Sequence, residues 1–133
     1  MTLNAFPSPQ IACGIDIITL AQMTQILNGD THDTESFLQR FYTPAEQAYC
    51  ETDIERIAGR WAAKEAISKA LGTGMHGIDW RDIEVLPDAL GQPQVHFYGD
   101  ALNRATFLQL TQWAVSISHS TTDATAIAVA LRR

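Results

Sequence analysis

The chain has 133 residues, of which 46% are hydrophobic and 18% are charged, and its formal net charge at pH 7 is −6. This length predicts one domain, because domains most often hold about 100–150 residues, and the hydrophobic content excludes an intrinsically disordered chain. Nine basic residues against fifteen acidic ones argue against a nucleic-acid partner, because such binding depends on a basic surface.

The cysteine content and the start of the chain favour a cytoplasmic protein. Cys13 and Cys50 are too few for a disulfide framework or a structural zinc site, so a reduced compartment is expected. Residues 1–10 contain two prolines and no Lys or Arg, which predicts a flexible N-terminal arm rather than a signal peptide. No apolar run approaches the ~20 residues of a membrane helix, so no membrane partner is expected. Residues 11–133 are therefore predicted to form the single domain.

The first elements after this arm are a predicted strand and a predicted helix. Residues 11–18 are mostly apolar and β-branched, which predicts a strand. The spacing of Leu20, Met23 and Leu27 predicts a helix, and Asn28-Gly29 ends it.

Capping signals predict three more helices. A short helix is expected over residues 34–41. Thr43-Pro44-Ala45-Glu46 then offers an N-cap hydroxyl, a proline at the first helical position and a glutamate at the third. Thr52 and Glu55 repeat the capping box before the longest predicted helix, residues 53–71. Gly72 and Gly74 end that helix.

The last third of the chain predicts two β-hairpins with a helix between them. A segment rich in proline and glycine, residues 87–93, marks the turn between strands at 82–86 and 94–98. A helix is expected at 100–111, and strands at 113–119 and 124–131 form the second hairpin. The order predicts an α+β domain with a mainly antiparallel sheet wrapped on one long helix.

Asp16 is unusual because it lies in the middle of the first predicted strand, among isoleucines. A carboxylate in such a place is costly unless it is paired, hydrogen-bonded or bound to a metal. Asp16 therefore either lies on a half-exposed strand face or serves a metal or catalytic site.

The longest predicted helix carries four of the nine basic residues, namely Arg56, Arg60, Lys64 and Lys69. The first three recur every four residues and so share one helix face. They are either solvated charges, with an ordinary Glu65–Lys69 pair beside them, or part of a phosphate site.

Glu65 lies at the edge of the apolar stripe of that helix. Two carboxylates near the core, Asp16 and Glu65, would suit one cation. Mg²⁺ fits best, because it takes one or two carboxylates, keeps waters and adds phosphate oxygens of a substrate.

Two further segments have alternative interpretations. Gly72-Thr73-Gly74 is either a helix stop or a place where backbone approaches a phosphate. His119 is either a surface residue or a ligand contact at a strand end. A hydrolase with Ser118 or Ser120 as nucleophile is disfavoured, because the chain has no Gly-x-Ser-x-Gly motif.

These residues belong to a set of motifs that resembles a known family. In order and spacing, over about residues 11–131, the chain resembles holo-acyl-carrier-protein synthase, the small and typically homotrimeric class of 4′-phosphopantetheinyl transferase. The motifs that carry the resemblance are Gly14-Ile15-Asp16-Ile17-Ile18, Phe41-x-Thr43-x-x-Glu46, Gly59-Arg60-Trp61-Ala62-Ala63-Lys64-Glu65-Ala66-x-x-Lys69-Ala70-Leu71-Gly72-Thr73-Gly74, Asp82-Ile83-Glu84-Val85, Gly91-x-Pro93 and Ser116-Ile117-Ser118-His119.

The resemblance implies a fold, a reaction and a site. The fold would be that of the 4′-phosphopantetheinyl transferases. The reaction would move the 4′-phosphopantetheine arm of coenzyme A onto a serine of an apo acyl carrier protein, with Mg²⁺, and release 3′,5′-ADP. Asp16 and Glu65 match the metal ligands, and Lys69 matches a pyrophosphate contact, so these three are the expected catalytic residues. The expected contacts to coenzyme A are Arg60, Lys64, Lys69, Gly72, Thr73, Gly74 and His119.

The chain departs from the family pattern at two places. Trp61 stands where the family most often has Phe. The helix after Asp16 carries Gln22 and Gln25 and no basic residue, whereas in the family this helix usually grips the acidic carrier with basic side chains. Either the acceptor is less acidic or is held by apolar contacts, or the chain binds coenzyme A and transfers poorly. A metal-dependent phosphohydrolase and a non-catalytic scaffold are the rival interpretations.

Overall fold

The computed structural model describes residues 10–29 and 33–132, so the predicted arm lies outside the described residues except for Gln10. The helices and strands follow in the order β1 (Ile11–Thr19), α1 (Leu20–Leu27), α2 (Thr34–Phe41), α3 (Pro44–Cys50), α4 (Ile54–Ala70), the 3₁₀ helix η1 (Trp80–Asp82), β2 (Ile83–Pro87), β3 (Pro93–Phe97), α5 (Gly99–Phe107), β4 (Leu110–His119) and β5 (Asp123–Arg132).

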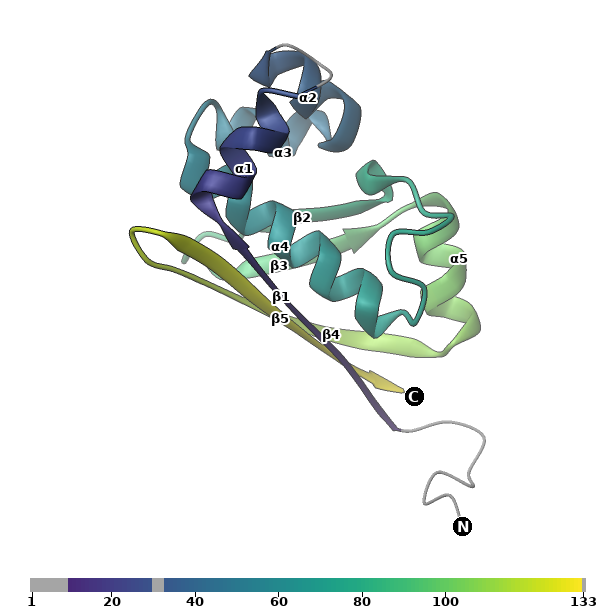
Figure 1. Ribbon diagram of the computed structural model, residues 1–133. Coiled ribbons are helices and arrows are strands. Elements are labelled where there is room, and N and C mark those ends of the chain that lie inside the picture. The colour runs from purple at the N-terminus through teal and green to yellow at the C-terminus, as the bar shows by residue number, and fades with distance from the viewer. Residues whose placement is uncertain (1–9, 30–32, 133) are drawn as a thin grey trace.

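The strands form two antiparallel sheets, which confirms the predicted α+β class. Strands β1, β5 and β4 make a three-stranded sheet in that order, and β2 pairs with β3 in a separate hairpin. Figure 1 shows α4 lying along one face of the three-stranded sheet, with α1, α2 and α3 gathered at one end of the molecule and α5 at the other. No helix among the described residues is long and apolar enough to cross a membrane.

Small side chains bring α4 unusually close to the sheet. Alternate residues of β5 are alanines buried on the α4 side, and they face the buried alanines of α4, namely Ala58, Ala62, Ala63, Ala66 and Ala70. On β1, a Cβ placed on Gly14 would lie 1.9 Å from the carbonyl oxygen of Ala66. Only glycine permits this approach, which places Asp16, two residues further along β1, on the side of α4.

The opposite face of the three-stranded sheet is left uncovered in the single chain. Alternate residues of β1 and β5 point away from α4, and five of them are large, apolar and exposed. Their side chains remain 41–66% exposed and are Ile11, Ile15, Ile17, Ile127 and Leu131. Contiguous apolar surface of this kind is typical of an interface.

Two predicted helix boundaries are wrong by a few residues. The long helix is capped by Asp53, whose carboxylate accepts from the backbone N–H groups of Glu55 and Arg56, and not by Thr52. The helix predicted to reach residue 111 ends at Phe107, because Gln109 takes a left-handed conformation with φ of 60° and β4 starts at Leu110. The short helix η1 was not predicted.

Candidate active site

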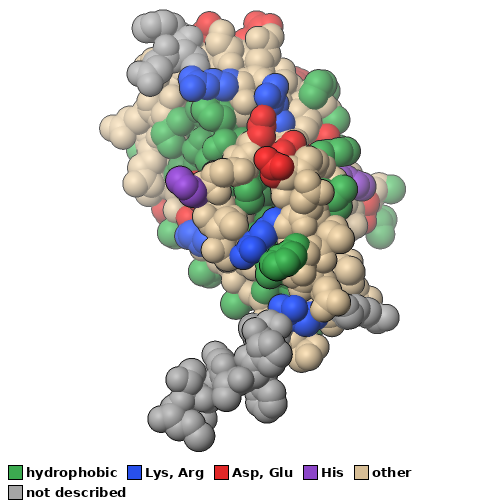
Figure 2. All heavy atoms as spheres, turned by 90° about the vertical axis from the view of Figure 1, so that its right-hand side faces the viewer, with side chains coloured by type: hydrophobic (Ala, Val, Ile, Leu, Met, Phe, Trp, Pro, Cys, Tyr) green, Lys and Arg blue, Asp and Glu red, His purple; other side chains and the backbone are tan. Residues whose placement is uncertain are grey.

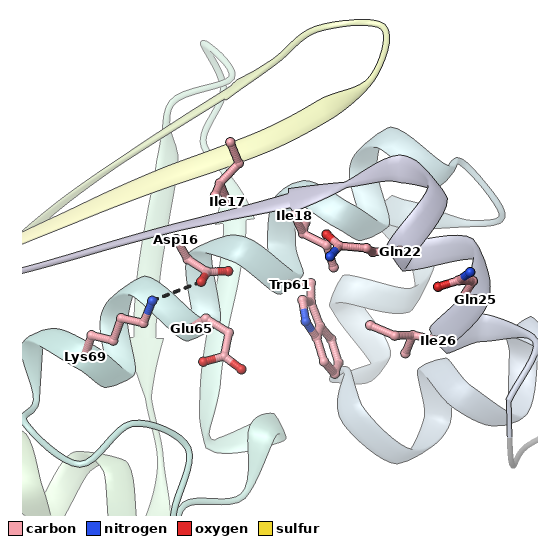
Figure 3. Close-up of a pocket in the computed structure, with 9 residues that line it drawn as sticks. All are labelled: Asp16, Ile17, Ile18, Gln22, Gln25, Ile26, Trp61, Glu65 and Lys69. Carbon is pink, nitrogen blue, oxygen red and sulfur yellow. Dashed lines mark hydrogen bonds and ion pairs between the residues drawn. The ribbon is translucent and has the colours of Figure 1, made fainter.

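A cavity of about 600 Å³ opens where β1, α1 and α4 meet. Figure 3 shows Asp16 of β1 and Glu65 and Lys69 of α4 on one side of it, and Trp61 with the α1 side chains on the other. The lining residues are Asp16, Ile17, Ile18, Gln22, Gln25, Ile26, Trp61, Glu65 and Lys69. The structure thus brings together the three residues expected to be catalytic.

Asp16 and Lys69 form an ion pair across the mouth of the cavity. The Lys69 ammonium donates to Oδ1 of Asp16 at 3.0 Å and to the carbonyl oxygen of Ile15 at 2.9 Å. The side chains of Lys69 and Asp16 are 48% and 20% exposed. A cation that stays half exposed beside a cavity is available to an anionic ligand.

Glu65 lies beside this ion pair and carries a perturbed carboxyl group. Its pKa is raised, chiefly because burial disfavours the carboxylate and then because the negative charge of Asp16 is near, while Lys69 opposes the shift. Two carboxylates that repel each other and face the same cavity form a donor set that a cation would stabilise.

The donor set fits Mg²⁺. Within residues 10–29 and 33–132, no group of three or more His, Cys, Asp or Glu residues is close enough to hold a metal by itself. Asp16 and Glu65 would therefore supply two oxygen ligands, and water and substrate oxygens would supply the others, which is the usual arrangement for Mg²⁺ beside a phosphate. A structural zinc site is a poor fit, because it would need four nitrogen or sulfur ligands.

Lys64, which was expected to contact coenzyme A, does not line this cavity. Its side chain is fully buried, and its ammonium donates to Oε1 of Glu46 at 2.7 Å, to the carbonyl of Trp80 at 2.8 Å and to the carbonyl of Ile83 at 2.6 Å. An ammonium has three N–H donors, so none is left for a phosphate. Burial lowers the pKa of Lys64, and the Glu46 carboxylate opposes that shift.

Arg60 shares the face of α4 that carries Lys64, as the spacing predicted. Its side chain is buried, its Nε donates to the carbonyl of Val85 at 3.3 Å, and its guanidinium lies 4.3 Å from the ring centre of Tyr49. This face packs against α3 and β2, away from Glu65 and Lys69. Arg60 is therefore not part of the cavity within one chain.

The segment Gly72-Thr73-Gly74 closes the end of α4. The N–H groups of Thr73 and Gly74 both donate to the carbonyl of Ser68, at 3.3 and 3.1 Å, and both glycines have positive φ. This geometry matches the helix-stop interpretation. None of the three residues lines the cavity.

His119 lies at the other end of α4 from Lys69. Its Nδ1 is 3.7 Å from Oε2 of Glu55, in the first turn of α4. The helix from Glu55 to Lys69 is about 21 Å long. One chain alone therefore does not bring His119 and Lys69 to the same point.

The serines beside His119 have other roles. Ser120 Oγ accepts from the backbone N–H groups of Thr122 and Asp123, at 3.2 Å each, and so shapes the turn between β4 and β5. Ser118 precedes His119 on the strand and points to the opposite face of the sheet. The arrangement gives no support to the serine hydrolase.

Several cavity residues were not predicted as site residues. Trp61 departs from the family pattern, and it lies one turn before Glu65 and forms the opposite wall. The i, i+4 spacing of Trp61 and Glu65 is the signal that would have found it. Gln22 and Gln25 were noted for lacking charge, and they line the cavity from α1.

Charges of both signs are mixed on one face of the molecule. Figure 2 shows acidic and basic side chains interspersed with apolar ones over the face in view, without a continuous basic surface there. Such a face does not suit a nucleic-acid backbone.

Known proteins share this fold, and together with the paired carboxylates and the neighbouring lysine it defines a class of protein. A family model described as the 4′-phosphopantetheinyl transferase superfamily matches residues 12–130. Similar proteins include the holo-[acyl-carrier-protein] synthases of Alkaliphilus oremlandii, 40% identical over 89% of this chain and 96% of its own, and of Solidesulfovibrio magneticus, 43% identical over 87% and 94%. The chain therefore belongs to this superfamily, in its holo-[acyl-carrier-protein] synthase family, as the motifs predicted.

Solved structures of the same family superpose closely. The holo-[acyl-carrier-protein] synthase of Helicobacter pylori in complex with coenzyme A is 28% identical, with a TM-score of 0.77 over 89% of this chain and 98% of that chain. The enzyme from Neisseria meningitidis is 31% identical, with a TM-score of 0.79 over 91% and 98%. The predicted 4′-phosphopantetheinyl transferase fold is confirmed.

Proposed function

We propose that this chain transfers the 4′-phosphopantetheine arm of coenzyme A to a serine of an apo acyl carrier protein, in a Mg²⁺-dependent reaction that releases 3′,5′-ADP. The observation that carries the proposal is the convergence of Asp16, Glu65 and Lys69 on one cavity. The family membership and the coenzyme A held by the Helicobacter pylori relative support it.

The reaction exchanges one phosphorus–oxygen bond for another. The serine oxygen of the acceptor bonds to the β-phosphorus of coenzyme A, and the bond from that phosphorus to the bridging oxygen breaks, so that 3′,5′-ADP leaves with the bond electrons. Negative charge builds on the phosphate oxygens as this happens. The Lys69 ammonium, half exposed and already paired with a carboxylate, is placed to hold that charge.

Asp16 and Glu65 would hold the Mg²⁺ ion. There the ion would supply charge neutralisation and orientation of the pyrophosphate. One of the two carboxylates, or a water beside them, accepts the proton of the acceptor serine. Trp61 and the apolar residues of β1 and α1 form the apolar part of the cavity wall.

We also propose a homotrimer in the cytoplasm, with each site shared between two chains. The uncovered apolar face of the three-stranded sheet supports an interface with other copies. The positions of Lys69 and His119 at opposite ends of α4 support sharing, because a neighbouring chain can bring its own His119 to the coenzyme A held by Lys69.

The acceptor docks beside α1 by contacts that do not depend on charge. The exposed side chains of α1 nearest the cavity are Gln22 and Gln25, and the helix carries no basic residue. Binding of the acceptor should therefore weaken little as salt rises, since only exposed charge pairs are screened. A steep loss of acceptor binding with salt would contradict this docking.

The test is the intact mass of a panel of apo carrier proteins after incubation with this protein, coenzyme A and Mg²⁺. Added 4′-phosphopantetheine on one carrier, lost when a chelator is present, is the expected result and identifies the acceptor. Cleavage of coenzyme A while every carrier stays apo would establish the phosphohydrolase instead. Intact coenzyme A with no modified carrier would overturn the proposed transfer for that panel.

A further inference from the structure

A cluster of four aromatic rings lies behind one wall of the cavity. Phe37 and Phe41 come from α2, Trp61 from α4 and Trp80 from η1. The rings of Trp61 and Trp80 are nearly parallel, with centres 3.9 Å apart and planes at 17°. Phe41 packs edge-on against both indoles, at 5.8 and 6.0 Å, and Phe37 lies 5.4 Å from Trp61.

Only one ring of this cluster faces the catalytic residues. Trp61 lines the cavity together with Asp16 and Glu65, while Trp80 does not. Trp61 and Glu65 lie one helical turn apart, so the indole borders the Glu65 carboxylate on the same face of α4. The place of the Trp61 ring therefore sets the width of the cavity beside that carboxylate.

The backbone at Trp80 is held in place by the buried Glu46–Lys64 ion pair. The Lys64 ammonium donates to the carbonyl of Trp80 at 2.8 Å and to Glu46 at 2.7 Å. Glu46 accepts from the backbone N–H of Val85 at 2.8 Å, which fixes the following strand. The carboxylate of Asp79 caps η1 through the N–H of Arg81. The backbone that carries Trp80 is thus tied to α3, α4 and β2.

These contacts form a continuous series from the buried Glu46–Lys64 ion pair to the cavity wall. Lys64 holds the main chain at Trp80, Trp80 stacks on Trp61, and Trp61 borders Glu65. Neither Lys64 nor Trp80 lines the cavity, so both act on it through Trp61. A stacked indole pair is a rigid contact, because each ring covers the flat face of the other.

We propose that Trp80 is a positioning residue for the transfer reaction: its stack on Trp61, anchored by the Glu46–Lys64 pair, holds the cavity wall that faces Asp16 and Glu65. The inference rests on the proposed function, because it concerns the same site. It gives Lys64 a place in the site's architecture although the ammonium touches no ligand. An indole at position 61 suits this role better than a smaller ring, because it offers more area to the stack.

The stack has a spectroscopic readout that does not depend on activity. Two parallel indoles at van der Waals distance couple their electronic transitions and give a paired positive and negative band in far-ultraviolet circular dichroism. We expect this couplet in the full-length chain, its loss in both Trp80→Leu and Trp61→Phe, and its retention in Trp113→Leu. Trp113 is the matched control, since it packs edge-on against Phe97 with ring centres 4.9 Å apart and lies outside the cavity.

The kinetic test compares these variants below the unfolding temperature of each. Trp80→Leu should lower kcat by about tenfold with a smaller change in KM, because a displaced wall misplaces bound substrate rather than removing a contact. Trp80→Phe, which keeps a ring for Trp61 to stack on, should recover most of the loss. Trp113→Leu should lower the unfolding temperature and leave kcat unchanged.

The outcomes separate the stack from general stability. A folded Trp80→Leu variant with wild-type kcat would overturn the proposal, and so would an equal loss of kcat in Trp113→Leu. If the leucine variant does not fold, Trp80→Met, whose flexible chain fills more of the gap, takes its place. Wild-type protein that shows the couplet and no transfer would contradict the proposed function and leave the stack itself established.

Discussion

The ammonium of Lys69 lies 3.0 Å from Oδ1 of Asp16, and this ion pair joins the last turn of α4 to the middle of β1. The two residues are far apart in the sequence, and the close packing of β1 on α4 is what brings them together. Both face the cavity, so the pair serves the site as well as the fold.

Lys69→Met should reduce transfer at least about a hundredfold, because the phosphate oxygens would lose a positive charge in the transition state. Its effect on the free energy of unfolding should be at most about 1 kcal/mol, because an ion pair whose lysine stays half exposed contributes little. Steady-state transfer rates and urea unfolding measure the two effects.

Arg81→Met is the matched control for that variant. Arg81 forms an ion pair of the same length with Asp79, 3.0 Å, with both side chains about half exposed, and it lies outside the cavity. We expect its transfer rate to equal that of the wild type. Equal losses of stability and rate in Lys69→Met would instead mark the Asp16–Lys69 pair as structural.

Glu65→Gln should abolish Mg²⁺-dependent transfer while the protein stays folded. The amide has nearly the shape of the carboxylate and lacks its negative charge, so the site loses one of its two anionic metal ligands. Relief of the repulsion with Asp16 should leave the free energy of unfolding unchanged or slightly higher. Titration of Mg²⁺ in the assay measures the loss, and Glu35→Gln on the exposed side of α2 is the control. Near-normal turnover in Glu65→Gln would remove Glu65 from the mechanism.

Gly14→Ala should destabilise the protein by about 3 kcal/mol, because overpacking at a rigid contact is costly. The new methyl group would meet backbone atoms of α4, with the Ala66 oxygen at 1.9 Å. Separation of β1 from α4 would also move Asp16 away from Glu65, so transfer should fall even where the variant is folded.

Gly59→Ala tests the same interface without the backbone clash. A Cβ at Gly59 would meet only a methyl group of Ile117, at 3.1 Å, and alanine is the better helix former. Urea unfolding should show a change within about 1 kcal/mol of wild type. A similarly large loss of stability in both variants would contradict the close approach of β1 to α4 at Gly14.

The sequence singles out the three proposed catalytic residues because each of them carries a local signal. Asp16 interrupts a strand, Glu65 borders an apolar stripe, and Lys69 follows Glu65 by one turn. The face shared by Arg60 and Lys64 was also predicted correctly. Helical periodicity does not show which part of the protein that face packs against, because this depends on tertiary packing.

Glu46 shows where local reasoning ends. The sequence identified it as half of a capping box, and its Oε1 does accept from the N–H of Thr43 at 3.0 Å. The same oxygen also accepts from Lys64, which lies on another helix. A residue that satisfies a local rule gives no sign of a second, distant partner, so the buried pair and the stack behind Trp61 became visible only in the structure.

Alkaline pH should destabilise the fold through the thiol of Cys50. Burial is the main cause that raises its pKa from 9.0 to about 12. Between these values the unfolded chain releases the thiol proton and the folded chain keeps it, so stability falls as pH rises above 9. The loss should be about 1 kcal/mol at pH 10. The measurement is the free energy of unfolding in urea as a function of pH, for the wild type and for Cys50→Ala. The loss above pH 9 should be smaller in Cys50→Ala, and identical pH profiles for the two proteins would contradict the prediction.

Subunit complementation tests whether one site uses two chains. Lys69 and His119 lie at opposite ends of α4, so in a ring of three copies the Lys69 end of one chain would meet the His119 end of the next. Lys69→Met and His119→Ala chains, each weak alone, should regain activity when they are co-expressed and assemble together. Random mixing in equal amounts makes one interface in four intact, so about a quarter of wild-type activity is expected. If both residues served a site within one chain, every site in the mixture would carry a defect and the activity would stay at the average of the two variants.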